Sequence, residues 1–107
     1  MKRTPSTAGL PTSVRSALAQ LGRDVSAARK RRRLTTVIVA ERAFVSRNTI
    51  TRVERGDPSV SIGIYATVLF VLGLGDRIGG LAAASTDEIG LGLESEQLPK
   101  RVRGRVS

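Results

Sequence analysis

Apolar residues recur at helical spacing near the start of the chain, and this spacing constrains the fold more than any other feature. The residues are Val14, Leu18, Leu21, Val25 and Ala28. Their intervals of four, three, four and three residues place the side chains on one face of an α-helix. Ser13 is suited to cap the start of this helix. Five consecutive cations, residues 29–33, suit the C-terminus of this helix, which is the negative end of the helix dipole.

The composition of the chain agrees with a helical fold. Its 107 residues include only three aromatic side chains, so aliphatic residues and alanine must form most of the core. Sandwiches and barrels favour β-branched and aromatic residues in alternation. We therefore expect an all-α fold, a compact domain of four or five helices over residues 13–83. We also expect a flexible arm over residues 1–12 and a tail over residues 84–107 that is basic and disordered at its end.

Two short helices are predicted in the middle of the chain. Thr35 and Thr36 open the first of them. After a brief turn at residues 43–45, Ser46 caps the second, because its hydroxyl can accept hydrogen bonds from amides two or three residues further on. Gly56 ends this second helix, since glycine readily adopts the backbone conformation that follows a helix.

The second short helix has an inner and an outer face. Because each residue turns an α-helix by about 100°, Ile50 and Val53 share the inner face. The outer face carries polar and basic residues: Asn48, Thr51, Arg52 and Arg55, with Arg47 on its flank. A further helix over about residues 62–72 is apolar nearly all round, which indicates burial on two sides, one of them a subunit contact. A short helix over residues 76–83 is expected to follow.

Positive charge gathers around these two short helices. The chain has a net charge of +9, and residues 23–55 hold ten of its 18 Lys and Arg but only three of its nine acids. Such a charge indicates a polyanionic partner, either nucleic acid or an anionic membrane. A membrane partner is not expected, because the most apolar stretch, residues 62–74, is too short to span a bilayer. The N-terminus does not resemble a signal peptide, so a cytoplasmic location is expected.

The absence of Cys and His bounds the chemistry of the chain. It excludes disulfides and thiolate metal sites and removes the commonest general base. We therefore expect no enzyme activity, no metal and no cofactor. The glycines of residues 73–79 have the wrong spacing for a dinucleotide-binding loop. Glu94 and Glu96 lie in a predicted loop without a partner, which does not support paired-carboxylate chemistry.

Residues 34–56 resemble the helix-turn-helix of phage repressors, the Xre type. The resemblance is carried by LTTVIVA at residues 34–40 and by VSRNTITRVERG at residues 45–56. The family pattern is a short helix with Ala in its middle, followed by Val-Ser-x-x-Thr-Ile-x-x-Ile/Val-Glu-x-Gly. The resemblance covers about residues 20–75 and implies a lambda-repressor-like fold. It also implies sequence-specific transcriptional repression by a homodimer on a palindromic operator in double-stranded DNA.

The same resemblance assigns roles to individual residues. Arg47, Asn48 and Arg52 match base-reading positions, since Arg can pair with guanine and Asn with adenine in the major groove. Arg29 and Glu54 match a pair that joins the first helix to the third, and we interpret them as structural. Residues expected to contact the DNA backbone are Thr36, Ser46, Thr51, Arg55, Arg31, Arg32 and Arg33.

Three alternatives to these roles stay open. Solvated surface charge would also account for Arg47 and Arg52. Asn48 would also fit as a polar residue at the start of a helix without a DNA contact. The helix dipole alone would account for the cations of residues 29–33. The family usually has Gln where Thr36 stands, which weakens the expected phosphate contact there, although a hydroxyl can still donate a hydrogen bond.

A second resemblance covers residues 56–74. The segments GDPSVSIGIYA and VLFVLGL are similar to the DNA-binding antitoxins of HipB type, as is the PKRVR of the tail. Such antitoxins typically dimerise, repress their own operon and bind a HipA-like kinase toxin. The resemblance implies an antitoxin of this kind, with the toxin on the first helix, the region of residues 62–83 or the tail. The alternatives are a stand-alone phage-type or metabolic repressor, and an RNA-binding or nucleoid protein without sequence preference.

Overall fold

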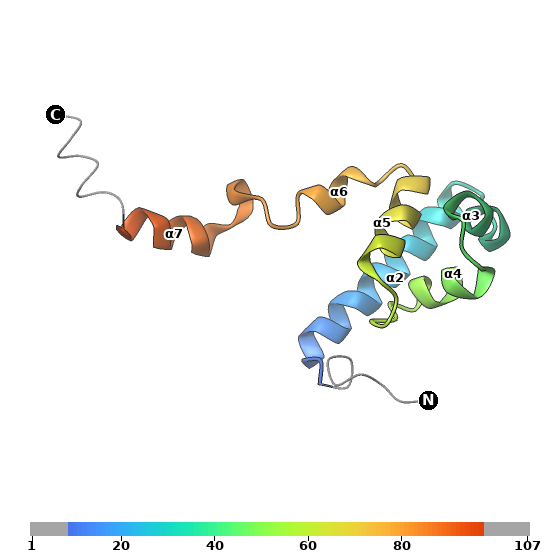
Figure 1. Cartoon of the computed structure of the whole chain (residues 1–107), viewed down its shortest axis with the longest axis horizontal. Coiled ribbons are helices and arrows are strands. Elements are labelled where there is room, and N and C mark those ends of the chain that lie inside the picture. The colour runs from blue at the N-terminus through green and yellow to red at the C-terminus, as the bar shows by residue number, and fades with distance from the viewer. Residues whose placement is uncertain (1–8, 98–107) are drawn as a thin grey trace. The chain divides into compact units, whose positions relative to one another are not determined.

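Helices account for all of the regular secondary structure between residues 9 and 97, which are the residues that the computed structural model describes (Figure 1). The predicted all-α fold is therefore confirmed. The chain divides after Asp76 into two units. Residues 1–8 of the predicted arm and residues 98–107 of the predicted basic tail lie outside the described residues.

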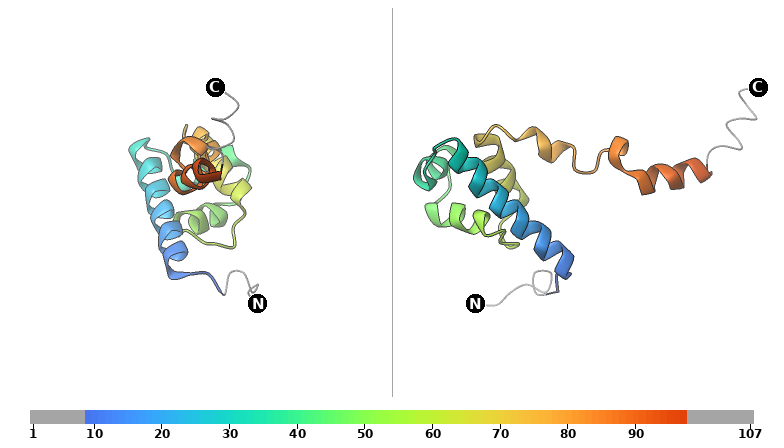
Figure 2. Two further views of the ribbon diagram at one scale, coloured as in Figure 1. Left: turned by 90° about the vertical axis from the view of Figure 1, so that its left-hand side faces the viewer. Right: turned by 180° about the vertical axis from the view of Figure 1, so that it is seen from behind.

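Four helices of the first unit lie against one another, as both views of Figure 2 show. In chain order they are α2 (Thr12–Arg31), α3 (Thr36–Ala43), α4 (Arg47–Glu54) and α5 (Ile62–Val71). α2 contacts α4, and α3 contacts both α4 and α5. A turn of three residues joins α3 to α4, which is the connection expected of a helix-turn-helix. None of the helices between residues 9 and 97 has the length and hydropathy needed to cross a bilayer.

The start of α2 differs from the prediction. The helix begins at Thr12, and Pro11 rather than Ser13 occupies the cap position. The carbonyl of Pro11 accepts hydrogen bonds from the amides of Val14 and Arg15, both at 3.1 Å. The predicted Ser13 cap is wrong because the fixed φ of proline already directs the chain into the helix one residue earlier.

The core lies between these four helices. Its fully buried large side chains are Val25, Val39, Ile50, Val53 and Val68. The predicted inner face of α4 is confirmed, since Ile50 and Val53 are both 0% exposed. Burial along α2 increases toward its C-terminus, because Val14 is exposed whereas Val25 and Ala28 are buried. The buried residues of α2 therefore lie between its middle and its C-terminus.

All four helices of the first unit end in the same backbone turn. At each end, one amide bonds to the carbonyl five residues back, and the preceding amide bonds to the carbonyl three residues back. The left-handed residues of these turns are Arg33, Phe44, Gly56 and Gly73. Glycine suits such a turn because a Cβ disfavours positive φ. Gly56 is predicted from the sequence, whereas no sequence signal marks the turns at Arg33 and Phe44.

The second unit begins within α6 (Asp76–Gly79) and continues through the 3₁₀ turn η1 (Ala84–Thr86) to α7 (Glu88–Gln97). The helix predicted over residues 76–83 stops at Gly79, because a second glycine follows and glycine disfavours a helix interior. None of the residues in α6, η1 and α7 is buried.

The predicted loop around Glu94 and Glu96 is wrong, because both residues lie in α7. The helix begins where the Asp87 carboxylate accepts a hydrogen bond from the Gly90 amide at 3.0 Å. A carboxylate in this position satisfies an amide that the first turn leaves unpaired. The helix forms although it contains two glycines, which are unfavourable in a helix interior.

Candidate nucleic-acid interface

Hydroxyl groups cap both helices of the helix-turn-helix. Thr35 Oγ1 accepts a hydrogen bond from the Ile38 amide at 3.1 Å at the start of α3. Ser46 Oγ accepts one from the Thr49 amide at 3.1 Å at the start of α4, as predicted. Each cap satisfies only one of the unpaired amides of the first turn. The remaining amides and the helix dipole give each start a partial positive charge suited to a phosphate.

α2 and α4 approach each other closely through their backbones. A Cβ added to Gly22 would lie 2.5 Å from the Gly56 nitrogen and 2.6 Å from the Glu54 carbonyl oxygen. A Cβ added to Gly56 would collide with the carbonyl of Leu18. Glycine at both positions therefore sets the distance between α2 and α4. The sequence predicts Gly56 as a helix end but carries no signal for the contact at Gly22.

An ion pair between Arg29 and Glu54 joins the same two helices. Arg29 Nε donates to Glu54 Oε2 at 2.6 Å, and Arg29 Nη2 donates to Oε1 at 3.1 Å. The two side chains are only 12% and 13% exposed. Arg29 Nη1 also donates to the Leu34 carbonyl at 2.9 Å. Hydrogen bonding to Glu54 raises the pKa of Arg29, so Arg29 keeps its charge. Its hydrogen bonds to Glu54 and Leu34 fix both α4 and the loop after α2 on the body of α2.

The start of α4 presents two polar side chains to solvent. Arg47 and Asn48 are both exposed, and neither side chain is hydrogen-bonded to any residue between 9 and 97. Arg47 has five N–H donors, and Asn48 has two donors and an acceptor. Both side chains can therefore bind groups outside the protein without giving up an internal hydrogen bond.

The third predicted base-reading residue, Arg52, forms hydrogen bonds within the protein. Its Nε donates to Asp57 Oδ2 at 2.9 Å, and its Nη2 donates to Ser59 Oγ at 2.7 Å. The Ser59 amide and hydroxyl donate to the other carboxylate oxygen of Asp57, at 2.8 and 2.7 Å. Hydrogen bonds from Arg52, and then from Ser59, lower the pKa of Asp57 to about 2. Arg52 therefore orders the loop that follows α4.

Tyr65 of α5 extends this network into the core. Its buried hydroxyl donates to the Asp57 carbonyl at 2.8 Å. Burial raises the pKa of Tyr65, so the hydroxyl keeps the proton that it donates. The sequence marks Asp57 as a turn residue, but the network that connects it to Arg52, Ser59 and Tyr65 depends on tertiary contacts that no local pattern reveals.

The residues expected to contact the DNA backbone differ in how free their side chains are. Arg31, Arg33 and Arg55 are exposed and are not hydrogen-bonded through their side chains to residues 9–97. Arg32 Nη1 donates to the Ala28 carbonyl at 2.8 Å. Thr51 Oγ1 donates to the Arg47 carbonyl at 3.3 Å, so it would have to give up this bond to donate to a phosphate. Thr36 is half-buried in the first turn of α3.

α5 exposes large apolar side chains away from the core. Ile62 and Phe70 are 68% and 74% exposed, whereas Tyr65, Val68 and Leu69 are buried. Residues eight apart lie on the same side of an α-helix. Only one of the two predicted buried sides of α5 is therefore buried within the chain, and its second apolar side is exposed.

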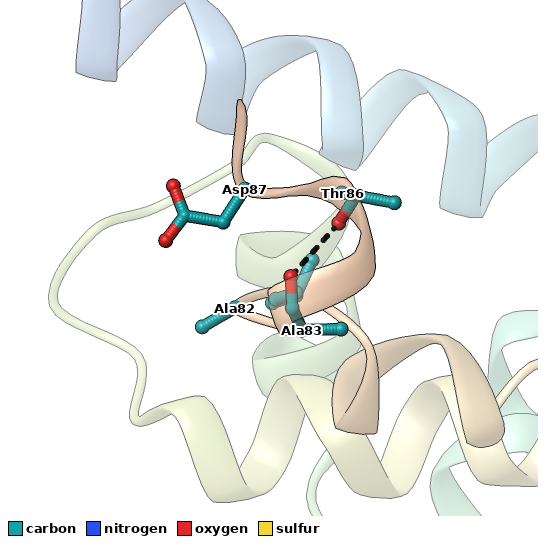
Figure 3. Close-up of a pocket in the computed structure, with 5 residues that line it drawn as sticks. Ala82, Ala83, Thr86 and Asp87 are labelled. Atoms are coloured by element: carbon teal, nitrogen blue, oxygen red, sulfur yellow. Dashed lines mark hydrogen bonds between the residues drawn. The ribbon is translucent and has the colours of Figure 1, made fainter. Parts of the chain in front are cut away.

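A shallow hollow lies in the second unit, beside η1 (Figure 3). Its lining residues are Leu81, Ala82, Ala83, Thr86 and Asp87. Figure 3 shows the Thr86 hydroxyl bonded to the Ala83 carbonyl, at 3.2 Å. The Asp87 carboxylate accepts from the α7 amide of Gly90. The polar side chains of the hollow thus serve local structure. No group of three or more acidic side chains suited to a metal occurs between residues 9 and 97.

The comparison with known families agrees with this geometry. Residues 20–78, more than half of the chain, match a family model described as a helix-turn-helix domain. No curated protein and no solved structure gives a significant match. The matched region contains the turn between α3 and α4, the Arg29–Glu54 pair and the exposed start of α4. The chain therefore belongs to the helix-turn-helix domain family and is a DNA-binding regulator.

Proposed function

We propose that the chain is a sequence-specific transcriptional repressor that places α4 in the major groove of DNA. The observation that carries this proposal is the exposed, unoccupied pair Arg47 and Asn48 at the capped start of α4. Arginine can bind O6 and N7 of guanine, and asparagine can bind N6 and N7 of adenine. The nearly buried Arg29–Glu54 pair holds α4 in place, which reduces the cost of ordering the two side chains on binding.

In this proposal Arg52 keeps its predicted base contact but has fewer free donors for it. Two of its N–H groups are already bound to Asp57 and Ser59. Base contact by Arg52 would therefore use its remaining Nη donors while the guanidinium stays oriented by Asp57. The exposed cations at residues 31, 33 and 55 supply phosphate contacts, which position the protein without reading the sequence.

The experiment that tests sequence-specific binding is selection of DNA from a random duplex pool by the purified full chain. We expect enrichment of one motif arranged as an inverted repeat, with half-sites centred about one helical turn apart. Enrichment of no motif, with similar binding to all sequences, would favour the RNA-binding or nucleoid alternative. RNA of matched length serves as the competitor.

The inverted repeat follows from a second part of the proposal, which is a homodimer through α5. Its support is the exposed apolar side formed by Ile62 and Phe70. A second copy is expected to cover this side, because exposed apolar area of this kind is stabilised by association. Phe70→Glu should convert a dimer into a monomer in sedimentation equilibrium, whereas Leu81→Glu in the second unit should not. A wild-type monomer at micromolar concentration would contradict the dimer.

The more specific proposal is an antitoxin that represses its own operon and binds a HipA-like kinase. Its support is the resemblance of residues 56–74 together with the character of residues 77–97. Residues 77–97 contain one cation and four acids, in contrast to the basic first unit. Exposed apolar side chains there include Leu81, Ile89, Leu91 and Leu93. Such a segment offers a surface for protein rather than for DNA.

Co-expression with a kinase-like reading frame from the same operon tests the antitoxin. We expect the kinase to co-purify with the chain and the double variant Ile89→Ser, Leu93→Ser to lose it while keeping DNA binding. If no kinase gene lies beside this one, or if the two proteins do not bind each other, the chain is a stand-alone repressor.

A further inference from the structure

Phe44 combines two unfavourable features in the turn between α3 and α4. Its backbone is left-handed, with φ 58° and ψ 41°, a conformation in which a Cβ is crowded. Its aromatic side chain is also 94% exposed, more than any other large apolar residue between 9 and 97. A residue that is both strained and exposed persists where the surroundings determine its conformation, and such residues concentrate at functional sites.

The fold does not require an aromatic residue at this turn. The Phe44 amide bonds to the Glu41 carbonyl at 3.3 Å, and the Val45 amide bonds to the Ala40 carbonyl at 3.1 Å. These bonds involve only the backbone. The ends of α4 and α5 make the same turn with Gly56 and Gly73. The side chain of Phe44 therefore contributes little to the turn or to the core. Any function of its ring must come from a contact outside the first unit.

The place of Phe44 indicates what its ring meets. Phe44 precedes the Ser46 cap by two residues, and two Cα–Cα steps of about 3.8 Å keep it within about 7.6 Å of that cap. Exposed cations lie on both sides of it in the chain, Arg42 at the end of α3 and Arg47 at the start of α4. Cations flank Phe44 in the sequence, and the helix start proposed to enter the major groove follows it, so this position suits a contact with DNA better than one with a protein partner.

We propose that Phe44 contacts the methyl group of a thymine next to the bases that Arg47 and Asn48 bind. This inference rests on the proposed function and adds a specificity-determining residue to it. A phenyl ring has no hydrogen-bonding group, so it cannot distinguish the polar edges of bases. The C5 methyl of thymine is the apolar group that the major groove presents, and Phe is among the residues that contact it.

The proposal is tested on the selected operator by replacing each thymine, one at a time, with deoxyuracil, which lacks only the methyl group. We expect one position in each half-site at which this change weakens wild-type binding by about three- to fivefold, the loss that corresponds to one buried methyl. Phe44→Gly should bind the unmodified operator with about the same loss and should be insensitive to deoxyuracil at that position. The melting temperature of Phe44→Gly should hold or rise, because glycine relieves the left-handed strain.

Arg33→Gly is the matched control, because Arg33 occupies the same left-handed turn at the end of α2 (φ 57°). It should weaken binding to operator and to random DNA alike and should keep the wild-type response to deoxyuracil. Loss of binding by Phe44→Gly together with a lower melting temperature would assign Phe44 to the fold and overturn the proposal.

Three other results would also overturn it. Binding of Phe44→Gly equal to wild type on every operator would leave the ring without a DNA contact. Equal loss on operator and random DNA would assign the ring to the sugar–phosphate backbone. Normal DNA binding combined with loss of repression in cells would assign it to a protein partner. Failure to select any operator would contradict the proposed function itself. Failure of the Phe44 proposal can therefore be distinguished from failure of the proposed function.

Discussion

Arg29 and Glu54 form a two-point ion pair that joins the end of α2 to the end of α4, with donor–acceptor distances of 2.6 and 3.1 Å. Both side chains are nearly buried. Removal of either one would therefore leave the other as an uncompensated charge. The pair therefore determines where α4 lies without occupying any of the exposed donors at its start.

Glu54→Ala should destabilise the domain by about 3 kcal/mol, because loss of one partner leaves a nearly buried guanidinium without its counter-charge. Urea unfolding of the variant should show a lower midpoint with a similar slope. Glu41→Ala, which removes an exposed acid from α3, is the control and should change stability by less than about 0.5 kcal/mol. Coincident unfolding curves for Glu54→Ala and wild type would remove the structural role of the pair.

Gly22→Ala should also destabilise the domain, although alanine is normally favoured in a helix by about 1 kcal/mol. The added methyl would meet the backbone at Gly56 and Glu54, which side-chain rotation cannot relieve. α2 and α4 would have to separate, and the core between them would lose contacts. Gly63→Ala on α5, where the nearest atom is 3.8 Å away, should be neutral or stabilising. A higher melting temperature for Gly22→Ala would show that the two helices do not pack as described.

A fall in pH should remove the stabilisation that the Arg52–Asp57 pair gives to the loop after α4. The pKa of Asp57 is about 2 in the folded protein, below its ordinary value of 3.8, chiefly because Arg52 donates to the carboxylate. A lowered folded pKa means that this contribution is fully present above pH 4 and is lost as the pH falls through 2. Because the pair is partly exposed, with side-chain exposures of 38% and 28%, its contribution should not exceed about 1 kcal/mol.

Unfolding of wild type and Asp57→Asn at a series of pH values from 5 to about 1.5 measures this contribution. The stability difference between the two proteins should be greatest at pH 5 and should vanish at the acid end. A difference that stays constant across the series would show that the Asp57 carboxylate has no lowered pKa in the folded protein.

Much of the interface could be predicted because its signals are local. The hydroxyl of Ser46 caps a helix whatever surrounds it, and the 3.6-residue period places Ile50 and Val53 inside. Arg29 and Glu54 are 25 residues apart, so their pairing could be inferred only through the family resemblance.

The remaining features depend on tertiary structure. Gly22 is recognisable only when the backbone of α4 is seen against it, and the binding of Arg52 to Asp57 and Ser59 requires the folded loop. The sequence does not predict the left-handed backbone of Phe44. That conformation is set by the end of α3 and the start of α4 rather than by an intrinsic preference of phenylalanine. The helix α7 was missed because its cap at Asp87 competes with two glycines that favour a loop.

The central claim is that Arg47 and Asn48 at the start of α4 read the DNA sequence, and binding of variants to the selected operator and to random DNA tests it most directly. Arg47→Ala should lose about 1–3 kcal/mol on the operator and little on random DNA. Arg77→Ala, which removes an exposed cation from the second unit, should lose little on either. Equal losses on operator and random DNA for Arg47→Ala would show that Arg47 contributes only charge and would contradict the account.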